Sequence, residues 1–125
     1  MDSDTTTTIA SLKQRVREFV NERDWQQFHS PKNLVMALTI EAGELMEHFQ
    51  WIGESESRAV ADQPDRLAEV AEEVSDVFCY LLAIANELGI DLAESFRLKM
   101  IKNRQKYPVE RYRGRFGDDD PSPVS

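Results

Sequence analysis

The sequence has 125 residues, which suits one domain built around a single hydrophobic core. Its composition, 41% hydrophobic and 30% charged, is that of a globular protein and excludes a disordered chain. The net charge of −8 argues against nucleic-acid partners, which need basic surface, and against docking on an anionic membrane. A small anionic substrate remains compatible with this charge, because a divalent cation and a local basic cluster can supply positive charge at a site.

No stretch of the sequence approaches the roughly 20 apolar residues that a membrane-spanning helix needs. Residues 1–8 have neither the basic start nor the apolar run of a secretory signal. We therefore expect a cytoplasmic protein.

The first helix should follow a flexible N-terminus of residues 1–8, with one of the threonines at 5–8 as its cap. Apolar residues then recur at helical spacing over about four turns. Further along, Ser30 and Pro31 have the form of an N-cap followed by the residue favoured at the first helical position. They predict a second helix over about residues 31–52, ended by Gly53.

A third helix is predicted from about Pro64 to Leu88, with Gly89 placed to end it. From Val74 onward this helix is apolar on more than one face, which is typical of a helix at the centre of a bundle or in an oligomer interface. Asp91 and Glu94 have the spacing of a capping box and predict a fourth helix.

The fourth helix should stop at Tyr107-Pro108. The sequence contains no strand-like alternation and no internal repeat, so we expect an all-α fold of four main helices. The expected domain covers residues 9–112, and residues 113–125 should form a flexible C-terminal tail.

Two of the predicted helices carry acidic residues three apart, which places each pair on one helix face. These pairs are Glu41 with Glu44 on the second helix and Glu73 with Asp76 on the third. Like charges at this spacing repel, and a cation between the helices would convert that repulsion into binding energy. The alternative is that these are solvated surface charges, and the pattern alone does not choose between the two interpretations.

Oxygen-only ligands favour a hard cation, Mg²⁺ first and Mn²⁺ second. A ferritin-like di-iron site is the competing interpretation, and it needs Glu-x-x-His on two helices. Leu45 stands three residues before His48, and the third helix has no histidine. The sequence therefore disfavours iron.

Aromatic residues flank the acidic helices and could stack a nucleobase, although core packing is their commoner role. Trp25 and His29 precede the second helix, Trp51 lies at its end, and Tyr80 lies one turn beyond Asp76. On the fourth helix Lys99 and Asn103 share a face, and they form either a phosphate contact or a solvated helix end.

Four blocks of sequence in order resemble the MazG-like, all-α nucleoside triphosphate pyrophosphohydrolases, and within them the dCTP pyrophosphatase branch. The similarity covers about residues 12–108. The blocks are Glu22-Arg23-Asp24-Trp25-x-Gln27-Phe28-His29-x-Pro31-x-Asn33-Leu34, Glu41-x-Gly43-Glu44-Leu45-x-Glu47-x-Phe49-Gln50-Trp51, Glu72-Glu73-x-Ser75-Asp76-Val77-x-x-Tyr80-Leu81 and Lys99-Met100-x-x-Asn103-Arg104-x-x-Tyr107-Pro108.

This resemblance implies a four-helix MazG-like bundle that hydrolyses a nucleoside triphosphate, dCTP or a modified dCTP first, to the monophosphate and pyrophosphate. It implies a homo-oligomer, dimer or tetramer, and a role in cleaning the nucleotide pool, while the net charge argues against nucleic-acid and membrane partners. The resemblance assigns Mg²⁺ binding and the substrate contacts to these residues: Glu41, Glu44, Glu73 and Asp76 for Mg²⁺, Trp25, His29, Trp51 and Tyr80 for base and sugar, and Lys99 and Asn103 for the phosphates.

Either Glu41 or Glu44 would position the attacking water, and the sequence does not choose between them. One departure from the wider superfamily is Ile40, which stands where a further glutamate is often found. Two other classes of function remain open alternatives, a non-catalytic nucleotide-binding bundle and an acidic helical interaction protein.

Overall fold

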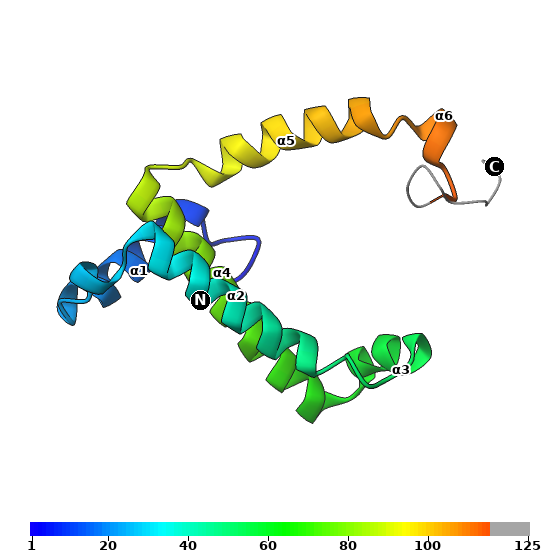
Figure 1. Cartoon of the computed structure of the whole chain (residues 1–125), viewed down its shortest axis with the longest axis horizontal. Coiled ribbons are helices and arrows are strands. Elements are labelled where there is room, and N and C mark those ends of the chain that lie inside the picture. Colours follow the sequence, from blue (N-terminus) through cyan, green and yellow to red (C-terminus); the bar gives the residue numbers. More distant parts are fainter. Residues whose placement is uncertain (116–125) are drawn as a thin grey trace. The chain divides into compact units, whose positions relative to one another are not determined.

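The structure, a computed structural model, describes residues 1–115, so most of the expected C-terminal tail lies outside the described residues. This part of the chain contains helices and turns but no strand, which confirms the all-α class. The elements follow in the order α1 (Ile9–Glu22), the 3₁₀ turn η1 (Gln26–Phe28), α2 (Pro31–Glu47), α3 (Glu54–Ala59), the 3₁₀ turn η2 (Val60–Asp62), α4 (Pro64–Leu88), α5 (Leu92–Lys106) and α6 (Val109–Tyr112) (Figure 1).

Three of the long helices begin as their cap residues predict. The side chains of Thr8, Ser30 and Asp91 each accept a hydrogen bond from the backbone N–H three residues on. Each cap thus satisfies one of the N–H groups that a helix start leaves without a partner. Gly89 ends α4 in the left-handed conformation, with φ of 64°, as its position in the sequence indicates.

The predicted end of the second helix is wrong. α2 ends at Glu47, and Gly53 is instead the N-cap of α3. After Glu47 the chain turns: the Ile52 N–H donates to the carbonyl of Phe49, three residues back, and the carbonyl of His48 accepts a hydrogen bond from Arg66. Residues 48–52, which the sequence predicts as helix, form a turn instead.

Residues 1–115 contain six α-helices, of which four are long, α1, α2, α4 and α5, where the sequence predicted four main helices. The two additional ones are α3, with six residues, and α6, with four. Both are too short to show a helical repeat of apolar residues.

The chain divides into two compact units, the first covering Met1–Ile90 and the second beginning at Asp91. In the first unit both α1 and α2 pack against α4 (Figure 1). Their contact with the second half of α4 forms the core, and the buried apolar side chains there are Val20, Leu34, Leu82, Ala83 and Ala85. This packing fixes where α2 lies along α4.

The apolar surface of α4 is less buried than expected. Leu67, Val74, Leu81 and Leu88 recur every seven residues, and each is between 41% and 55% exposed. Residues seven apart lie nearly on one line along a helix. A single copy of the chain therefore does not enclose α4 at the centre of a bundle, and a stripe of half-exposed apolar side chains runs along it.

Polar contacts join the start of the chain to the end of α4. The Lys13 ammonium donates to the Ile90 carbonyl at 2.8 Å, and the Asn86 amide donates to the Lys13 carbonyl at 3.0 Å. Arg17 donates to the Asn86 side chain at 3.0 Å. These contacts hold α1 on the last turns of α4.

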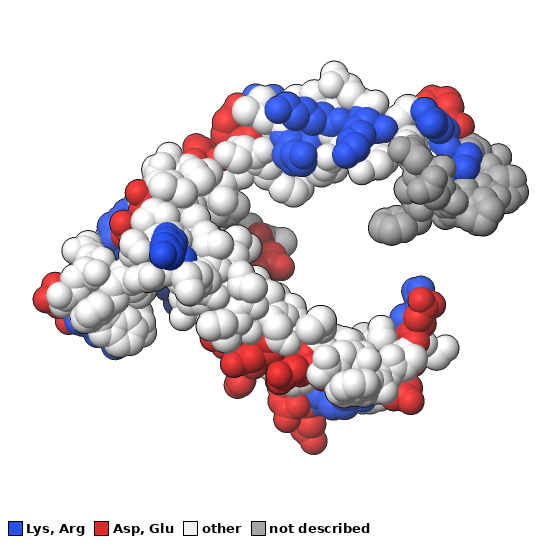
Figure 2. All heavy atoms as spheres, in the orientation of Figure 1, with Lys and Arg blue, Asp and Glu red and all other residues white. Residues whose placement is uncertain are grey.

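The second unit consists of α5 and α6 among the described residues. Lysine and arginine side chains gather along α5, whereas acidic side chains gather on α2, α3 and the first half of α4 (Figure 2). Within residues 1–115 no helix is both long and apolar enough to cross a membrane.

Candidate functional site

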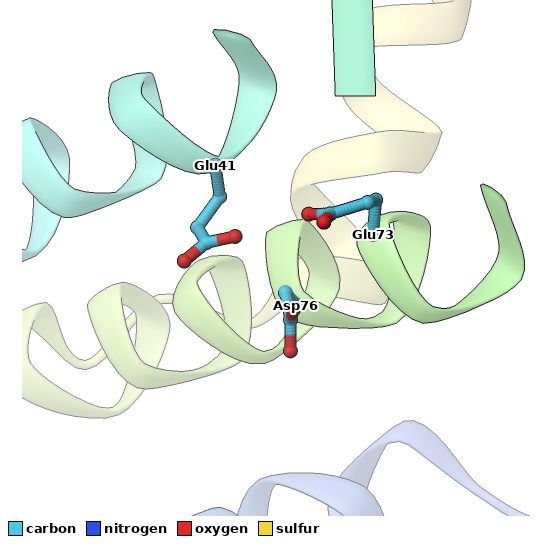
Figure 3. A group of neighbouring side chains, drawn as sticks. All are labelled: Glu41, Glu73 and Asp76. Atoms are coloured by element: carbon cyan, nitrogen blue, oxygen red, sulfur yellow. The ribbon is translucent and has the colours of Figure 1, made fainter. Parts of the chain in front are cut away.

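Three carboxylates meet between α2 and α4. One carboxylate oxygen from each of Glu41, Glu73 and Asp76 lies within 4.8 Å of the others. Glu41 reaches from α2 toward α4, which carries both other acids (Figure 3). Residues 32 positions apart in the sequence thus form one acidic cluster, which we call the carboxylate trio.

The packing of α2 on α4 explains why these side chains meet. The two helices run antiparallel, because Glu41 faces Glu73 while His48, later on α2, contacts Arg66, earlier on α4. Leu34, two turns before Glu41, is 2% exposed and anchors α2 in the core. Seven residues make about two helical turns, so Leu34, Glu41 and His48 all lie on the face of α2 that meets α4.

The trio is partly shut off from water. One carboxylate oxygen of Glu41 and one of Glu73 are buried and have no hydrogen-bond partner. Burial and the neighbouring carboxylates of Glu44, Asp76 and Glu73 raise the pKa of Glu41 to about 7. A carboxyl group among acids and away from solvent favours its protonated form, because a second negative charge there is poorly solvated and repelled.

These features suit a divalent metal cation. Two charges about 5 Å apart repel by roughly 1 kcal/mol in water and by roughly 3 kcal/mol at the effective dielectric of a protein surface. A cation would give each buried oxygen a partner and replace repulsion with attraction. The oxygen-only donor set matches a hard ion such as Mg²⁺ or Mn²⁺ and lacks the nitrogen or sulfur donors that zinc prefers.

Glu44 does not belong to the trio. It lies on α2 one turn after Glu41, is exposed, and is close enough for its carboxylate to raise the pKa of Glu41. The family resemblance implies that all four acids form one ligand set. In the structure three of them converge, and Glu44 borders them on the solvent side.

Trp25 and His29 lie together at the start of α2. Their ring centroids are 6.3 Å apart, and the Trp25 ring also packs edge-on against Phe19 at 5.7 Å. Trp25 is 42% exposed, so part of its ring remains available to a ligand. The structure therefore brings these two sequence-predicted residues into one aromatic group.

The other two aromatics lie elsewhere. Tyr80 is half-buried on α4, one turn beyond Asp76 and hence near the trio. Trp51 is 87% exposed and follows the C-terminal end of α2, whereas His29 precedes its N-terminal end. A helix of 17 residues is about 25 Å long, so one copy of the chain does not bring Trp51 to His29.

Lys99 and Asn103 lie on α5 in the second unit, one turn apart on one face of the helix. Lys99 is exposed, and the amide of Asn103 contacts the sulfur of Met100 at 3.9 Å. The phosphate role expected for this pair stays a prediction.

A cavity of about 180 Å³ opens between α1, η1 and the end of α4. Its polar lining includes His29, Arg17, Asn21, Asn86 and Glu87. Apart from His29, the sequence reasoning did not select these residues. No motif marks them, because they come from the α1–η1 region and from the end of α4, which are far apart in the chain and meet only through the packing of α1 on α4.

Comparison with known proteins identifies relatives over most of the chain. The MazG-like family model matches residues 36–115. A dCTP pyrophosphatase 1 from Rattus norvegicus is 46% identical over 86% of this chain and 63% of its own length. The dCTP pyrophosphatase 1 of Homo sapiens is 42% identical over 82% of this chain and 60% of its own length. The chain thus spans about three fifths of the length of these curated relatives.

A solved structure is also similar. A pyrophosphatase from Archaeoglobus fulgidus superposes with a TM-score of 0.74 at 36% sequence identity. The superposition covers 86% of this chain and 99% of that protein. This solved protein therefore shares its fold with 86% of the present chain.

Proposed function

This chain belongs to the MazG-like family, and from that membership we propose that it is a nucleoside triphosphate pyrophosphohydrolase. Its substrate is dCTP or a modified dCTP, and its products are the nucleoside monophosphate and pyrophosphate. The names of the relatives support the reaction, since the curated ones are dCTP pyrophosphatases and the solved one is a pyrophosphatase. We place this activity in the cytoplasm, as a step that removes unwanted nucleotides from the pool.

The observation that carries the proposal is the carboxylate trio with its two buried, partnerless oxygens. Glu41, Glu73 and Asp76 would hold Mg²⁺, with Glu44 completing the set from the solvent side. When bound, Mg²⁺ supplies positive charge that orients the triphosphate and stabilises the pyrophosphate leaving group.

Glu44 is our preferred group for handling the attacking water. Glu44 borders the trio on the solvent side and is exposed, so it would contact both the metal and the water, whereas Glu41 has a buried oxygen and faces two other acids. A carboxylate oxygen of Glu44 would accept a proton as the water oxygen bonds to the α-phosphorus. The bond from that phosphorus to the bridging oxygen breaks, and pyrophosphate leaves with the bonding electron pair.

The aromatic groups would bind the nucleoside. Trp25 and His29 form one platform beside a polar cavity, and Tyr80 lies near the trio on α4. Flat aromatic rings stack on any base, so discrimination for cytosine requires hydrogen bonds as well. Lys99 and Asn103 would contact the phosphates, and Trp51 would cover the base from a second copy of the chain.

A homo-oligomer, dimer or tetramer, is part of the proposal. The half-exposed stripe of Leu67, Val74, Leu81 and Leu88 is the kind of surface that a second copy buries. The separation of Trp51 from His29 within one copy also favours a site built by two copies. Sedimentation of the pure protein measures the oligomeric state, and Leu88→Glu should shift it toward the monomer.

The direct test is to incubate the pure protein with Mg²⁺ and each nucleoside triphosphate in turn. We expect monophosphate and pyrophosphate in equal amounts, fastest with dCTP or a modified dCTP. Release of orthophosphate and a diphosphate would contradict the proposal. Thermal stabilisation by nucleotide without any product would instead favour a non-catalytic binding protein.

A further inference from the structure

A half-buried arginine, Arg66, connects the C-terminal end of α2 to the N-terminal end of α4. One terminal nitrogen of Arg66 (Nη2) donates to the backbone carbonyl of His48 at 3.3 Å. The other (Nη1) donates to the side-chain oxygen of Gln63 at 3.3 Å. Arg66 therefore ties the C-cap of α2 to the residue that precedes α4. Neither the family resemblance nor the sequence pattern singled out this residue.

The Arg66–His48 contact joins the same two helices, α2 and α4, as the carboxylate trio. His48 follows Glu41 by seven residues on α2, and Arg66 precedes Glu73 by seven residues on α4. Because seven residues make about two turns and the helices are antiparallel, the Arg66–His48 contact lies two turns from the Glu41–Glu73 contact on both helices. A shift of α2 along or away from α4 at one contact must move the other.

The Glu41–Glu73 contact destabilises the packing of α2 on α4, and the Arg66–His48 contact stabilises it. Glu41 and Glu73 bring like charges together and bury an oxygen of each without a partner, so this contact pushes the helices apart. The Arg66 guanidinium satisfies a carbonyl that the end of α2 leaves without an intrahelical partner, and its positive charge also suits a helix C-terminus. This second contact holds the helices together next to the repulsive one.

We propose that Arg66 is a positioning residue for the metal site, and this rests on the proposed role of the trio as ligands. By holding the end of α2 on the start of α4, Arg66 keeps Glu41 at the distance from Glu73 at which both can hold one divalent cation. Without the two hydrogen bonds of Arg66 (the clamp), Leu34 still holds the first half of α2 on α4, but repulsion between the carboxylates moves Glu41 away from Glu73, and the cation must draw them together before it binds. The ligands stay present, but the site loses its preorganisation.

Removing the two hydrogen bonds of Arg66 and removing its positive charge should have opposite effects on metal affinity. A positive charge near the trio repels a cation, so removing it should tighten binding if charge alone matters. Removing the clamp should weaken binding. Arg66→Gln removes both, and Arg58→Gln is its matched control, because Arg58 is exposed on α3 and carries the same charge.

The experiment measures Mn²⁺ binding to the full chain, without nucleotide, from the electron paramagnetic resonance signal of free Mn²⁺. It is run well below the melting temperature of each variant, with circular dichroism to verify the helices. We expect Arg66→Gln to weaken Mn²⁺ binding by about tenfold, the lower end of the range for groups that orient metal ligands. Arg58→Gln should match the wild type or bind slightly tighter.

Arg66→Lys keeps the charge but cannot reach two acceptors in a fixed fork, so its affinity should lie between wild type and Arg66→Gln. If Arg66→Gln does not fold, Arg66→Lys decides alone, with several-fold weaker binding expected. Wild-type or tighter binding in the folded variant overturns the proposal. If wild type binds no Mn²⁺, the trio is not a metal site and the proposed function fails with it, whereas binding without nucleotide hydrolysis contradicts only the proposed reaction.

Discussion

Glu41 on α2 and Glu73 on α4 face each other across the helix seam, and each has one buried carboxylate oxygen without a hydrogen-bond partner. Burying such an oxygen without a partner costs stability. In the proposed function, a bound cation would give both oxygens a partner. The contact between α2 and α4 would then be less stable without metal than with it, as is common at functional sites.

Neutralising a member of the trio should abolish the proposed activity. Glu73→Gln and Asp76→Asn each remove a charged oxygen donor with little change in size, and we expect nucleotide hydrolysis to fall by about a hundredfold or more. Glu72→Gln is the matched control, because Glu72 is an exposed neighbour on the same helix that lies outside the trio. Its rate should stay close to wild type. Equal losses in all three variants would contradict the assignment.

The stability of the metal-free protein should fall as the pH rises from 5 to 8. Burial and the carboxylates of Glu44, Asp76 and Glu73 raise the pKa of Glu41 from 4.5 to about 7. Between these values the folded state holds more protons than the unfolded state, so stability decreases with pH. Thermal melts in the presence of a chelator measure this slope.

Glu41→Gln provides the comparison for the pH series. Glutamine has no proton to lose, so this variant should show a flatter dependence of melting temperature on pH than wild type. At pH 8 it should also be the more stable of the two metal-free proteins. Parallel slopes would mean that Glu41 does not titrate in this range.

Divalent metal should stabilise the wild-type protein. A cation that binds only the folded state at one hundred times its dissociation constant adds about 2.7 kcal/mol to the free energy of unfolding. For a chain of this size that corresponds to a rise in melting temperature of about 10 °C. Calorimetry with and without Mn²⁺ measures the shift, and Glu73→Gln should lose most of it.

Two glycines should respond to alanine with opposite signs. Gly89 has φ of 64° and open space around its Cα, so Gly89→Ala meets backbone strain alone and should cost about 1 kcal/mol. Gly43 lies inside α2 with equally open space, so Gly43→Ala should add up to about 1 kcal/mol. Chemical denaturation of both variants tests the pair, and equal changes would argue against the left-handed cap at Gly89.

The local parts of the fold could be read from the sequence because their causes are local. The caps at Thr8, Ser30 and Asp91 act on N–H groups three residues away, and the full length of α4 follows from its apolar repeat and its terminal Gly89. The predicted end of α2 is wrong: the chain turns after Glu47, and the carbonyl of His48 accepts a hydrogen bond from a distant residue, Arg66. Nothing in residues 48–52 themselves indicates the contact with Arg66.

The candidate site likewise depends partly on local sequence and partly on the packing between helices. Helical spacing alone placed Glu41 and Glu44 on one face and Glu73 and Asp76 on another, since it depends on the 3.6-residue turn. Which acids converge depends on how far α2 lies along α4, and the burial of Leu34 in the core sets that register. The sequence therefore determined the helices and the faces that carry the acids, while only the packing between helices decided that Glu41 meets Glu73 and Asp76, that Glu44 stays outside, and that Trp51 is far from His29.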